Sequence, residues 1–294
     1  MELISLHNGP LTFTALSAGF SEHPDGPLVV CLHGFPDNPH SFRHQLPVLA
    51  QAGFRAIAPT MRGYERSSIP PSNDFAVATM ARDVVAWLDE LQIDRAHLVG
   101  HDWGALVAYP AGVLFPRRFR TITSIAIPPP FRFLSGALRV PVQWWKSWYV
   151  VRFQARGFAE RLIERNDWAY VRKLWRVWSP GYRLSDAEWE GLRETLSVPG
   201  VKEAALQYYR QNATPSIILG LKKTEATYDT TISVRTLAIT GAQDGCMDTR
   251  MFDHTFRTDD FPAGYRIERI DDAGHFPHLE RPDVVNKLLI EWFG

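Results

Sequence analysis

Two patterns of hydrophobic positions alternate along the chain. Short apolar runs rich in β-branched residues predict strands, and longer segments with apolar residues every three or four positions predict amphipathic helices. The predicted strands cover residues 2–6, 11–18, 28–32, 55–58, 96–100, 121–127, 234–240 and 265–270. The predicted helices cover residues 40–52, 75–91, 103–115 and 282–293. The first two strands flank a turn, which predicts a hairpin. The later alternation of strand and helix predicts an α/β fold with a mostly parallel sheet.

The alternation stops at the prolines at positions 128–130 and resumes only at the strand over 234–240. From residue 131 to about 212 the periodicity is helical throughout. An insertion of this length is within the size range of a small domain. The sequence therefore predicts a core formed by residues 1–128 and 213–294, interrupted by a helical cap over 129–212.

The amino-acid composition limits the classes of protein to which this chain can belong. The 294 residues are 45% hydrophobic and 22% charged, which is typical of a globular chain. Lys plus Arg and Asp plus Glu are both 32, so the zero net charge argues against a nucleic-acid partner. The predicted cap carries an excess of positive charge and the predicted core an equal excess of negative charge. This division suggests electrostatic matching between them.

Three features of the sequence bear on where in the cell the protein resides. No apolar run is long enough for a membrane span, and the first 20 residues lack the pattern of a signal peptide. The two cysteines, Cys31 and Cys246, have no metal-binding or redox spacing and are expected to be buried free thiols. We therefore expect a cytoplasmic protein. The sequence leaves a homo-oligomer open.

The strongest chemical signal is residues 100–104, GHDWG, between a predicted strand and a predicted helix. A glycine on each side of a central nucleophile is typical of a sharp turn that presents that side chain above a helix N-terminus. Here the centre is Asp102, where an esterase would have serine. A carboxylate needs no base to act as a nucleophile, and its attack on a saturated carbon gives an ester intermediate.

A second motif, residues 33–36 (HGFP), follows the buried strand over 28–32. In an architecture of this kind the loop at this position supplies one backbone N–H to an oxyanion hole, and the residue after the nucleophile supplies the other. The predicted donors are therefore Phe35 and Trp103.

A catalytic base must lie late in the chain to complete the order nucleophile, acid, histidine. His275 follows a glycine between the last strand and the last helix and is the preferred base. His278 is the competing candidate and is better explained as a helix-entry residue. Asp244, in the turn after the strand over 234–240, is the predicted acid that orients the base. Asp248 is the competing acid and is better explained as a helix cap.

Together these motifs resemble the soluble epoxide hydrolase family of the α/β-hydrolase fold. The resemblance covers nearly the whole chain and rests on residues 33–36, 100–104 and 274–276. Residues 62–67 resemble a further family loop, but Glu65 stands where the family has glycine. The resemblance implies an α/β-hydrolase fold with an eight-stranded, mostly parallel sheet and an inserted helical cap. It implies neither a metal nor an organic cofactor.

The family opens epoxides with two cap tyrosines that donate hydrogen bonds to the epoxide oxygen. The segments around Tyr149 and Tyr209 resemble those that carry these tyrosines, and Tyr208 and Tyr170 are the alternatives. Seven of the ten tryptophans lie in the predicted cap. Of these, Trp148 is expected to help Phe35 and Trp103 form the wall of an apolar substrate pocket.

The resulting hypothesis is an epoxide hydrolase. Asp102 attacks the epoxide, and His275 then activates water to hydrolyse the ester, releasing a diol. The expected partners are a small hydrophobic epoxide and water. A haloalkane dehalogenase would use the same nucleophile but needs donors to a halide, and Phe35 offers no side-chain donor. A non-catalytic binding protein of this fold is a third reading, but the nucleophile, acid and base are all present.

Overall fold

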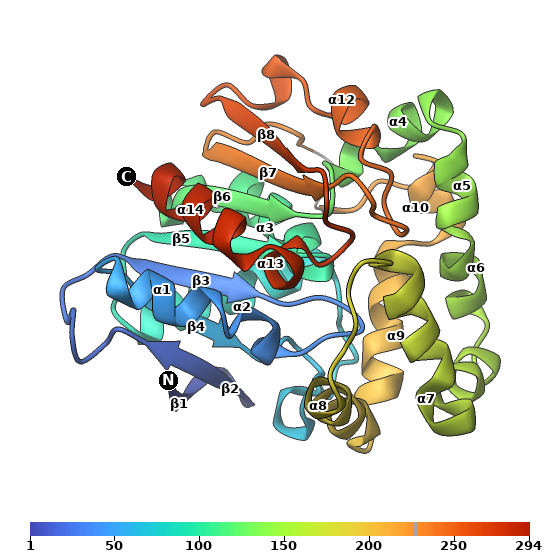
Figure 1. The fold of residues 1–294 in the computed structure, drawn as a ribbon, viewed down its shortest axis with the longest axis horizontal. Coiled ribbons are helices and arrows are strands. Elements are labelled where there is room, and N and C mark those ends of the chain that lie inside the picture. The colour runs from blue at the N-terminus through green and yellow to red at the C-terminus, as the bar shows by residue number, and fades with distance from the viewer. Residues whose placement is uncertain (226–228) are drawn as a thin grey trace.

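An eight-stranded sheet lies at the centre of the computed structural model, which describes residues 1–225 and 229–294 (Figure 1). The strands are β1 (Glu2–Asn8), β2 (Leu11–Ala18), β3 (Leu28–Leu32), β4 (Arg55–Pro59), β5 (Ala96–His101), β6 (Phe119–Ile125), β7 (Arg235–Gly241) and β8 (Tyr265–Ile270). Their order across the sheet is β1-β2-β4-β3-β5-β6-β7-β8. The β1–β2 and β2–β4 pairs are antiparallel, and the other pairs are parallel. The predicted mostly parallel α/β sheet and its opening hairpin are confirmed.

Helices cover both faces of this sheet. The core helices are α1 (Gln45–Gln51), α2 (Val77–Glu90), α3 (Trp103–Leu114), α12 (Met251–Thr255), α13 (Pro277–Glu280) and α14 (Pro282–Phe293). In β3, Val30 packs into the hydrophobic cluster that contains residues of α2 and α3, and Val29 packs into the cluster that contains residues of α1 and α14. Because successive side chains of a strand point to opposite faces, a strand buried on both faces is apolar throughout.

The helix predicted over residues 40–52 is wrong in one respect, because the structure divides it. A 3-10 turn covers Pro39–Phe42, and α1 begins only at Gln45. Pro47 provides the reason. Proline lacks an N–H and clashes with the preceding turn inside a helix, but it is tolerated in the first turn, where α1 places it.

The other α-helices of the described residues lie between β6 and β7. They are α4 (Phe133–Arg139), α5 (Val142–Lys146), α6 (Trp148–Gln154), α7 (Phe158–Trp178), α8 (Asp186–Ser197), α9 (Val201–Asn212) and α10 (Pro215–Ile218). Figure 1 shows this segment, which we call the cap, lying beside the carboxyl ends of β3 and β5. The helical run continues through α10, past residue 212. The exact division between cap and core stays a prediction.

Aromatic packing joins the cap to the core. The Trp175 ring of α7 stacks on Phe276, with ring centroids 3.6 Å apart and planes 5° apart. Its indole N–H donates to the carbonyl oxygen of Pro36 at 2.9 Å. Arg132 also forms an ion pair with Asp260 across the same boundary. These contacts fix the cap over the loops that follow β3 and β8 and over the segment that precedes β8.

The loop at residues 62–67 accommodates Glu65 without strain. Its φ angle is −143°, a value open to any residue, whereas Gly63 has φ +80°. The Glu65 carboxylate accepts hydrogen bonds from the backbone N–H of Thr14 at 2.6 Å and from the Thr14 hydroxyl at 2.9 Å. The residue that departs from the family pattern therefore ties this loop to β2.

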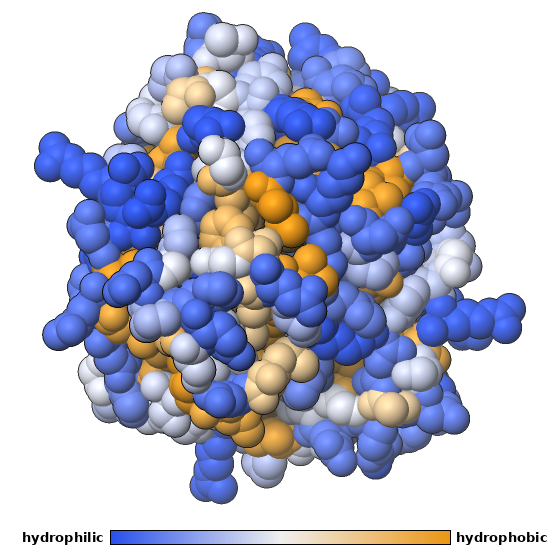
Figure 2. Space-filling model, turned by 60° about the vertical axis from the view of Figure 1, so that its left-hand side comes forward, coloured by the Kyte–Doolittle hydropathy of each residue, from blue (hydrophilic) through white to orange (hydrophobic). Residues whose placement is uncertain are grey.

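The surface is mixed in character. Figure 2 shows a face on which hydrophilic residues predominate around a narrow strip of hydrophobic ones. Several of the exposed large hydrophobic residues belong instead to the cap, Trp145 being 79% exposed. Within residues 1–225 and 229–294, none of the helices combines the length and hydrophobicity that crossing a bilayer requires.

Candidate active site

Asp102 occupies a sharp turn between β5 and α3. Its backbone has φ 50° and ψ −114°, a strained conformation for a residue with a side chain. The flanking glycines allow the turn to close. A Cβ on Gly100 would lie 2.2 Å from the carbonyl oxygen of Gly104, and one on Gly104 would lie 2.1 Å from that of Leu32. No side chain fits at either position, so the turn geometry requires the glycines of the motif.

The Asp102 carboxylate is buried and has a different partner on each oxygen. The backbone N–H of Phe35 donates to Oδ1 at 2.8 Å. The other oxygen, Oδ2, lies 3.4 Å from Nε2 of His275. Trp103 is the first residue of α3, so the positive end of that helix also faces the carboxylate. The structure thus brings the sequence-predicted residues Phe35, Asp102, Trp103 and His275 together.

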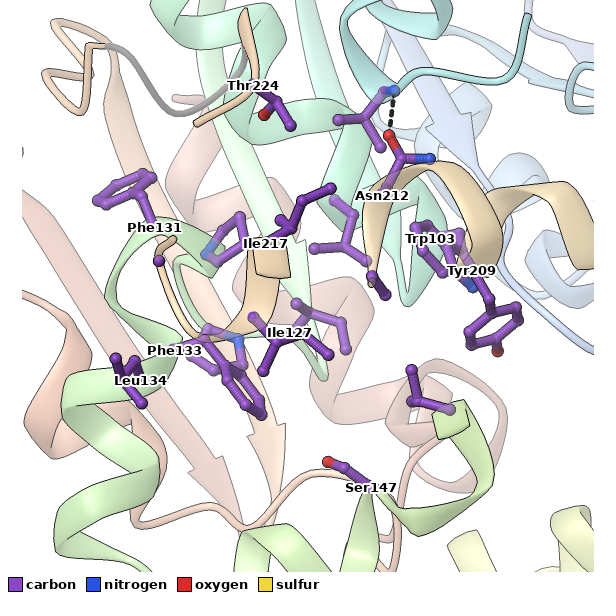
Figure 3. Close-up of a pocket in the computed structure, with 18 of the residues that line it drawn as sticks. Trp103, Ile127, Phe131, Phe133, Leu134, Ser147, Tyr209, Asn212, Ile217 and Thr224 are labelled. Carbon is purple, nitrogen blue, oxygen red and sulfur yellow. Dashed lines mark hydrogen bonds between the residues drawn. The ribbon is translucent and has the colours of Figure 1, made fainter. Parts of the chain in front are cut away.

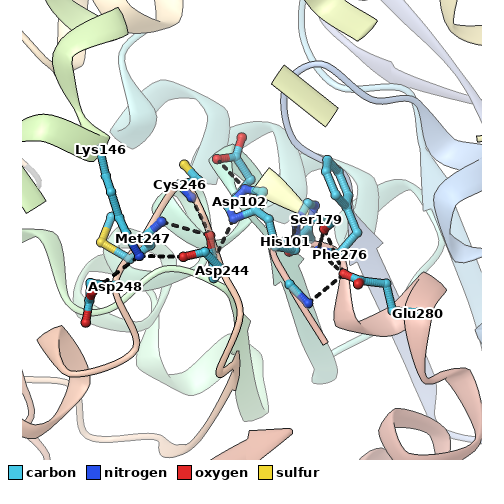
Figure 4. Close-up of polar contacts among 12 residues, drawn as sticks. His101, Asp102, Lys146, Ser179, Asp244, Cys246, Met247, Asp248, Phe276 and Glu280 are labelled. Carbon is cyan, nitrogen blue, oxygen red and sulfur yellow. Dashed lines mark hydrogen bonds and ion pairs between the residues drawn. The ribbon is translucent and has the colours of Figure 1, made fainter. Parts of the chain in front are cut away.

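His275 contacts Asp244 through its second ring nitrogen. Nδ1 lies 2.9 Å from Oδ2 of Asp244, and both side chains are fully buried. The other Asp244 oxygen, Oδ1, accepts backbone N–H groups from Cys246 at 2.6 Å and Met247 at 2.9 Å (Figure 4). Since a carboxylate only accepts, Nδ1 carries the proton and Nε2 faces Asp102.

The competing candidates lie elsewhere. Asp248 pairs with the Arg250 guanidinium at 2.8 Å and with the Lys146 ammonium at 3.2 Å. Arg250, rather than Asp248, is the residue immediately before α12, although its backbone N–H donates to the Asp248 carboxylate. His278 lies in α13 and stacks on Phe42, with ring centroids 5.0 Å apart. Neither candidate shares the contacts that link Asp244 to His275.

The carboxylates of Asp244 and Asp102 determine the charge of His275. Burial alone would lower the pKa of His275, but the negative charges of Asp244 and Asp102 outweigh burial and raise this pKa to about 10. The imidazole of His275 is therefore protonated near neutral pH. Removing either negative charge would lower the pKa of His275. The imidazole could then lose its proton more easily and be neutral.

Glu280, which sequence reasoning missed, holds the loop that carries His275. Its carboxylate oxygen Oε1 accepts the backbone N–H of Gly274 at 2.9 Å and that of Phe276 at 3.2 Å. The hydroxyl of Ser179, at the end of α7, donates to the same oxygen at 2.7 Å. The only signal in the sequence was an acidic residue five positions after the histidine. Figure 4 shows how Glu280 reaches back to this loop.

Two buried tyrosines of the cap face the cavity beside Asp102. The rings of Tyr149 and Tyr209 lie 5.9 Å apart, and both residues line the cavity together with Asp102. The Tyr149 hydroxyl is 3.4 Å from Sγ of Cys246, whose position in the site the sequence did not reveal. The Tyr209 hydroxyl has no hydrogen-bond partner among the described residues. Burial raises the pKa of both phenols well above the usual value, so both keep their protons as donors.

The alternative tyrosines have other surroundings. Tyr208 donates its hydroxyl to the backbone carbonyl of Arg62 at 2.6 Å, so its only proton is already engaged. Tyr170 packs against Phe153 and is not part of the cavity lining. The geometry therefore favours Tyr149 and Tyr209 as the pair that can reach a bound molecule.

A cavity of about 260 Å³ opens beside Asp102 (Figure 3). Its wall is mostly apolar and comes from α3, the segment after β6, the cap helices and the segment after α9. Residues that sequence reasoning did not predict include Ile127, Phe131, Phe133, Leu134, Ile217 and Lys222. They lie in two stretches, residues 127–134 and 217–222, and no short motif links stretches so far apart in the chain.

Two of the predicted wall residues do not line this cavity. Trp148 lies outside it and is 37% exposed, with the Arg152 guanidinium 4.0 Å from its ring centroid. Successive residues of a helix point about 100° apart, so Trp148 faces away when Tyr149 faces inward. The Phe35 ring is fully buried and packs edge-on against Tyr209, at 5.5 Å, behind the cavity wall. Trp103 does line the cavity.

Comparison with known proteins identifies the family to which this chain belongs. The family described as alpha/beta hydrolase fold matches residues 27–282. Epoxide hydrolase A of Mycobacterium tuberculosis is 30% identical over 302 residues, covering 92% of this chain and 91% of that protein. The chain therefore belongs to the α/β-hydrolase fold family, and within it to the epoxide hydrolase family.

Two further relatives agree with this assignment. An epoxide hydrolase structure from an endophytic Streptomyces has a TM-score of 0.80 and 28% identity, covering 99% of this chain and 94% of that one. The pig protein named Bifunctional epoxide hydrolase 2 is 28% identical over 93% of this chain. The chain spans about half of that protein, 52% of its length.

Proposed function

We propose that the chain hydrolyses an epoxide to a vicinal diol through a covalent ester on Asp102. The observation that carries the proposal is the position of Asp102. Its carboxylate lies between the Phe35 N–H and His275, at the inner end of an apolar cavity that two protonated tyrosines also line. The names of the relatives support the same reaction class.

In the first step, Oδ2 of Asp102 attacks an epoxide carbon. The carbon–oxygen bond of the ring breaks, and the phenol of Tyr149 or Tyr209 donates a proton to the oxygen that leaves. Phenols suit this task because an opening alkoxide is a strong base. Oδ1 stays on the Phe35 N–H and becomes the carbonyl oxygen of the ester, so the N–H is already in position for the next step.

Formation of the ester changes the charge around His275. The Asp102 carboxylate loses its negative charge, which removes one of the two contacts that raise the pKa of His275. His275 can then release its proton, which passes to the phenolate left by the first step and restores the tyrosine. The neutral imidazole, held by Asp244, is left with a free Nε2 on the side of the ester.

In the second step, His275 removes a proton from a water molecule that attacks the ester carbonyl carbon. The negative charge passes to the former Oδ1, where the backbone N–H groups of Phe35 and Trp103 and the N-terminus of α3 stabilise it. Collapse of this intermediate breaks the bond between the carbonyl carbon and the diol oxygen. That oxygen takes the proton of the newly added hydroxyl, so the diol leaves, Asp102 is again a carboxylate, and His275 keeps the proton that it removed from water. Because the cavity wall is mostly apolar, we expect hydrophobic epoxides to be the better substrates.

A single-turnover reaction in ¹⁸O-labelled water tests the covalent route. With enzyme in excess over styrene oxide, the label should enter Asp102 and be absent from the first diol formed. Label in the first diol would show direct attack by water and would overturn the route. Asp102→Ala should abolish diol formation, and Asp248→Ala, which removes a carboxylate outside the site, should retain it.

The same preparation tests the rival functions. Incubation with 1-bromobutane should release no bromide, whereas bromide release without diol formation would identify a dehalogenase. Binding of styrene oxide without turnover would identify a non-catalytic binding protein.

A further inference from the structure

A second group of ionisable side chains lies behind the nucleophile. Asp37 follows the HGFP segment, His101 is the last residue of β5, and His278 belongs to α13. All three are buried, and one ligand atom from each lies within 4.8 Å of the others. None of them lines the cavity beside Asp102. We call this group the Asp37 cluster.

His101 and Asp37 are each held by one contact to the backbone. Nε2 of His101 lies 2.9 Å from the carbonyl oxygen of His275, and Oδ1 of Asp37 accepts the backbone N–H of Asn38 at 2.8 Å. A carbonyl oxygen only accepts, so Nε2 of His101 carries its proton and Nδ1 presents a lone pair to the cluster. Histidines that bind metals are commonly held in this way through the ring nitrogen that does not coordinate.

The other polar atoms of the Asp37 cluster have no hydrogen-bond partner among the described residues. Among the described residues, no hydrogen bond satisfies Oδ2 of Asp37, Nδ1 of His101 or either ring nitrogen of His278. Asp37 Oδ2 and His101 Nδ1 are 3.8 Å apart, which is too long for a hydrogen bond. The side-chain oxygen of Gln45 is also unpaired, although its amide donates to the backbone carbonyl of His278. Buried polar atoms normally find partners, so this concentration calls for another occupant.

We propose that the Asp37 cluster binds one divalent transition-metal ion of the zinc type, through Oδ2 of Asp37, Nδ1 of His101 and a ring nitrogen of His278. Two imidazoles and one carboxylate suit zinc and its neighbours, whereas calcium and magnesium prefer oxygen ligands. Bond lengths of about 2.0–2.2 Å require small side-chain movements that bring the ligand atoms closer together. The Gln45 oxygen or a water molecule completes the coordination.

The ion has a structural role in this proposal. It ties together the loop after β3, the end of β5 and the start of α13. Phe35, Asp102 and His275 lie next to these three anchoring points in the sequence. The proposal does not depend on the reaction assigned above, because metal binding is measured directly.

The test uses the purified chain after dialysis against a chelator. Zn²⁺ is added, excess metal is removed, and bound metal is measured by mass spectrometry and thermal unfolding. We expect one Zn²⁺ per chain and a rise in Tm of several degrees. Both should be lost in Asp37→Asn and in His278→Gln. His97→Gln, which replaces a buried histidine outside the cluster, should still bind the metal.

A second possible site provides the decisive control. Asp102, Cys246 and His275 also bring ligand atoms within 4.8 Å of one another. Binding there would be lost in Cys246→Ser and would give Co²⁺-loaded protein a strong sulfur-to-cobalt absorption band. If the metal binds at the Asp37 cluster, Cys246→Ser still binds it. The Co²⁺-loaded wild-type protein then lacks that band, and this second measurement does not depend on the folding of a variant. No bound metal, or binding that depends on Cys246, would overturn the proposal.

Discussion

The imidazole of His275 and the carboxylate of Asp244 form a buried contact, with Nδ1 and Oδ2 2.9 Å apart. Backbone N–H groups hold the other carboxylate oxygen, so Asp244 cannot turn away from the ring. This contact fixes which nitrogen carries the proton and leaves Nε2 directed at Asp102. The proposed roles of Asp102 as nucleophile and His275 as base depend on that orientation.

Asp244→Asn should slow ester hydrolysis more than ester formation. The amide can donate to Nδ1 and favour the wrong tautomer, and it no longer stabilises the imidazolium. We expect kcat to fall by about 10²–10⁴-fold. Rapid quenching followed by mass spectrometry should detect enzyme carrying the substrate as an ester. Asp248→Asn is the matched control and should turn over normally. Slow turnover of Asp244→Asn without any accumulated ester would contradict this role.

His275 should also make the protein less stable as the pH rises above neutrality. Its pKa is about 10 in the folded chain and about 6.5 when unfolded, so between these values only the folded state holds the proton. The free energy of unfolding contributed by this group therefore falls with increasing pH, by up to about 1.4 kcal/mol per pH unit.

His275→Gln removes that titration. Urea unfolding at pH 7 and pH 9 should show a smaller loss of stability in the variant than in the wild type. Other groups titrate in both proteins, so the comparison isolates His275. Equal losses in the two proteins would show that the folded-state pKa of His275 is not raised.

Tyr149→Phe and Tyr209→Phe should each impair opening of the epoxide. Both substitutions keep the ring and remove only the donor, so we expect the rate of ester formation to fall by about 10²-fold. Pre-steady-state quenching measures that step. Tyr208→Phe is the comparison, because its hydroxyl bonds the Arg62 carbonyl; it should cost about 1 kcal/mol of stability and retain the chemistry. Equal rates of ester formation in all three variants would remove the tyrosines from the mechanism.

The sequence revealed those parts of the protein in which local geometry limits residue choice. The turn at Asp102 tolerates no side chain at Gly100 or Gly104, so its geometry is visible as a motif. The central strands β3 and β5 were equally visible, because they are buried throughout and a strand buried on both faces is mostly apolar. The mostly parallel α/β fold therefore followed from short-range patterns.

Features that depend on side-chain direction or distant packing were not visible. Trp148 and Tyr149 are adjacent in the sequence, yet only Tyr149 faces the cavity, because α6 turns Trp148 outward. Asp37 and His278 are separated by most of the chain, and only the complete fold brings their side chains close together. Helical periodicity predicts that a face is buried but not what lies against it.

Gly34→Ala should damage the site directly. A Cβ at this position would lie 2.4 Å from Cβ of Asp102, so the nucleophile or the loop that carries Phe35 must move. Because a displacement of about 1 Å is enough to cost about 10²-fold in rate, we expect at least that loss of kcat/KM. Gly191→Ala is the control: it lies in α8, and its Cβ meets nothing closer than 3.9 Å. That variant should be fully active and gain about 0.5–1 kcal/mol of stability. Full activity in Gly34→Ala would show that this loop adapts freely.

His33 should make the folded chain sensitive to acid. Its Nε2 accepts the backbone N–H of Met61 at 3.0 Å, and its Nδ1 lies 3.0 Å from the carbonyl oxygen of Gly34. Burial lowers the pKa of His33 to about 4. Between this value and the unfolded pKa of about 6.5, only the unfolded state binds the proton. The free energy of unfolding should therefore fall as the pH drops through that interval, by up to about 1.4 kcal/mol per pH unit.

His33→Gln tests this coupling. Glutamine can still accept the Met61 N–H but does not titrate, so the variant should lose less stability than the wild type between pH 6.5 and pH 4.5. Urea unfolding at these two values measures the difference. His40→Gln, at an exposed position, controls for the replacement of a histidine and should follow the wild type. If His33→Gln loses as much stability in acid as the wild type does, protonation of His33 is not what weakens the fold.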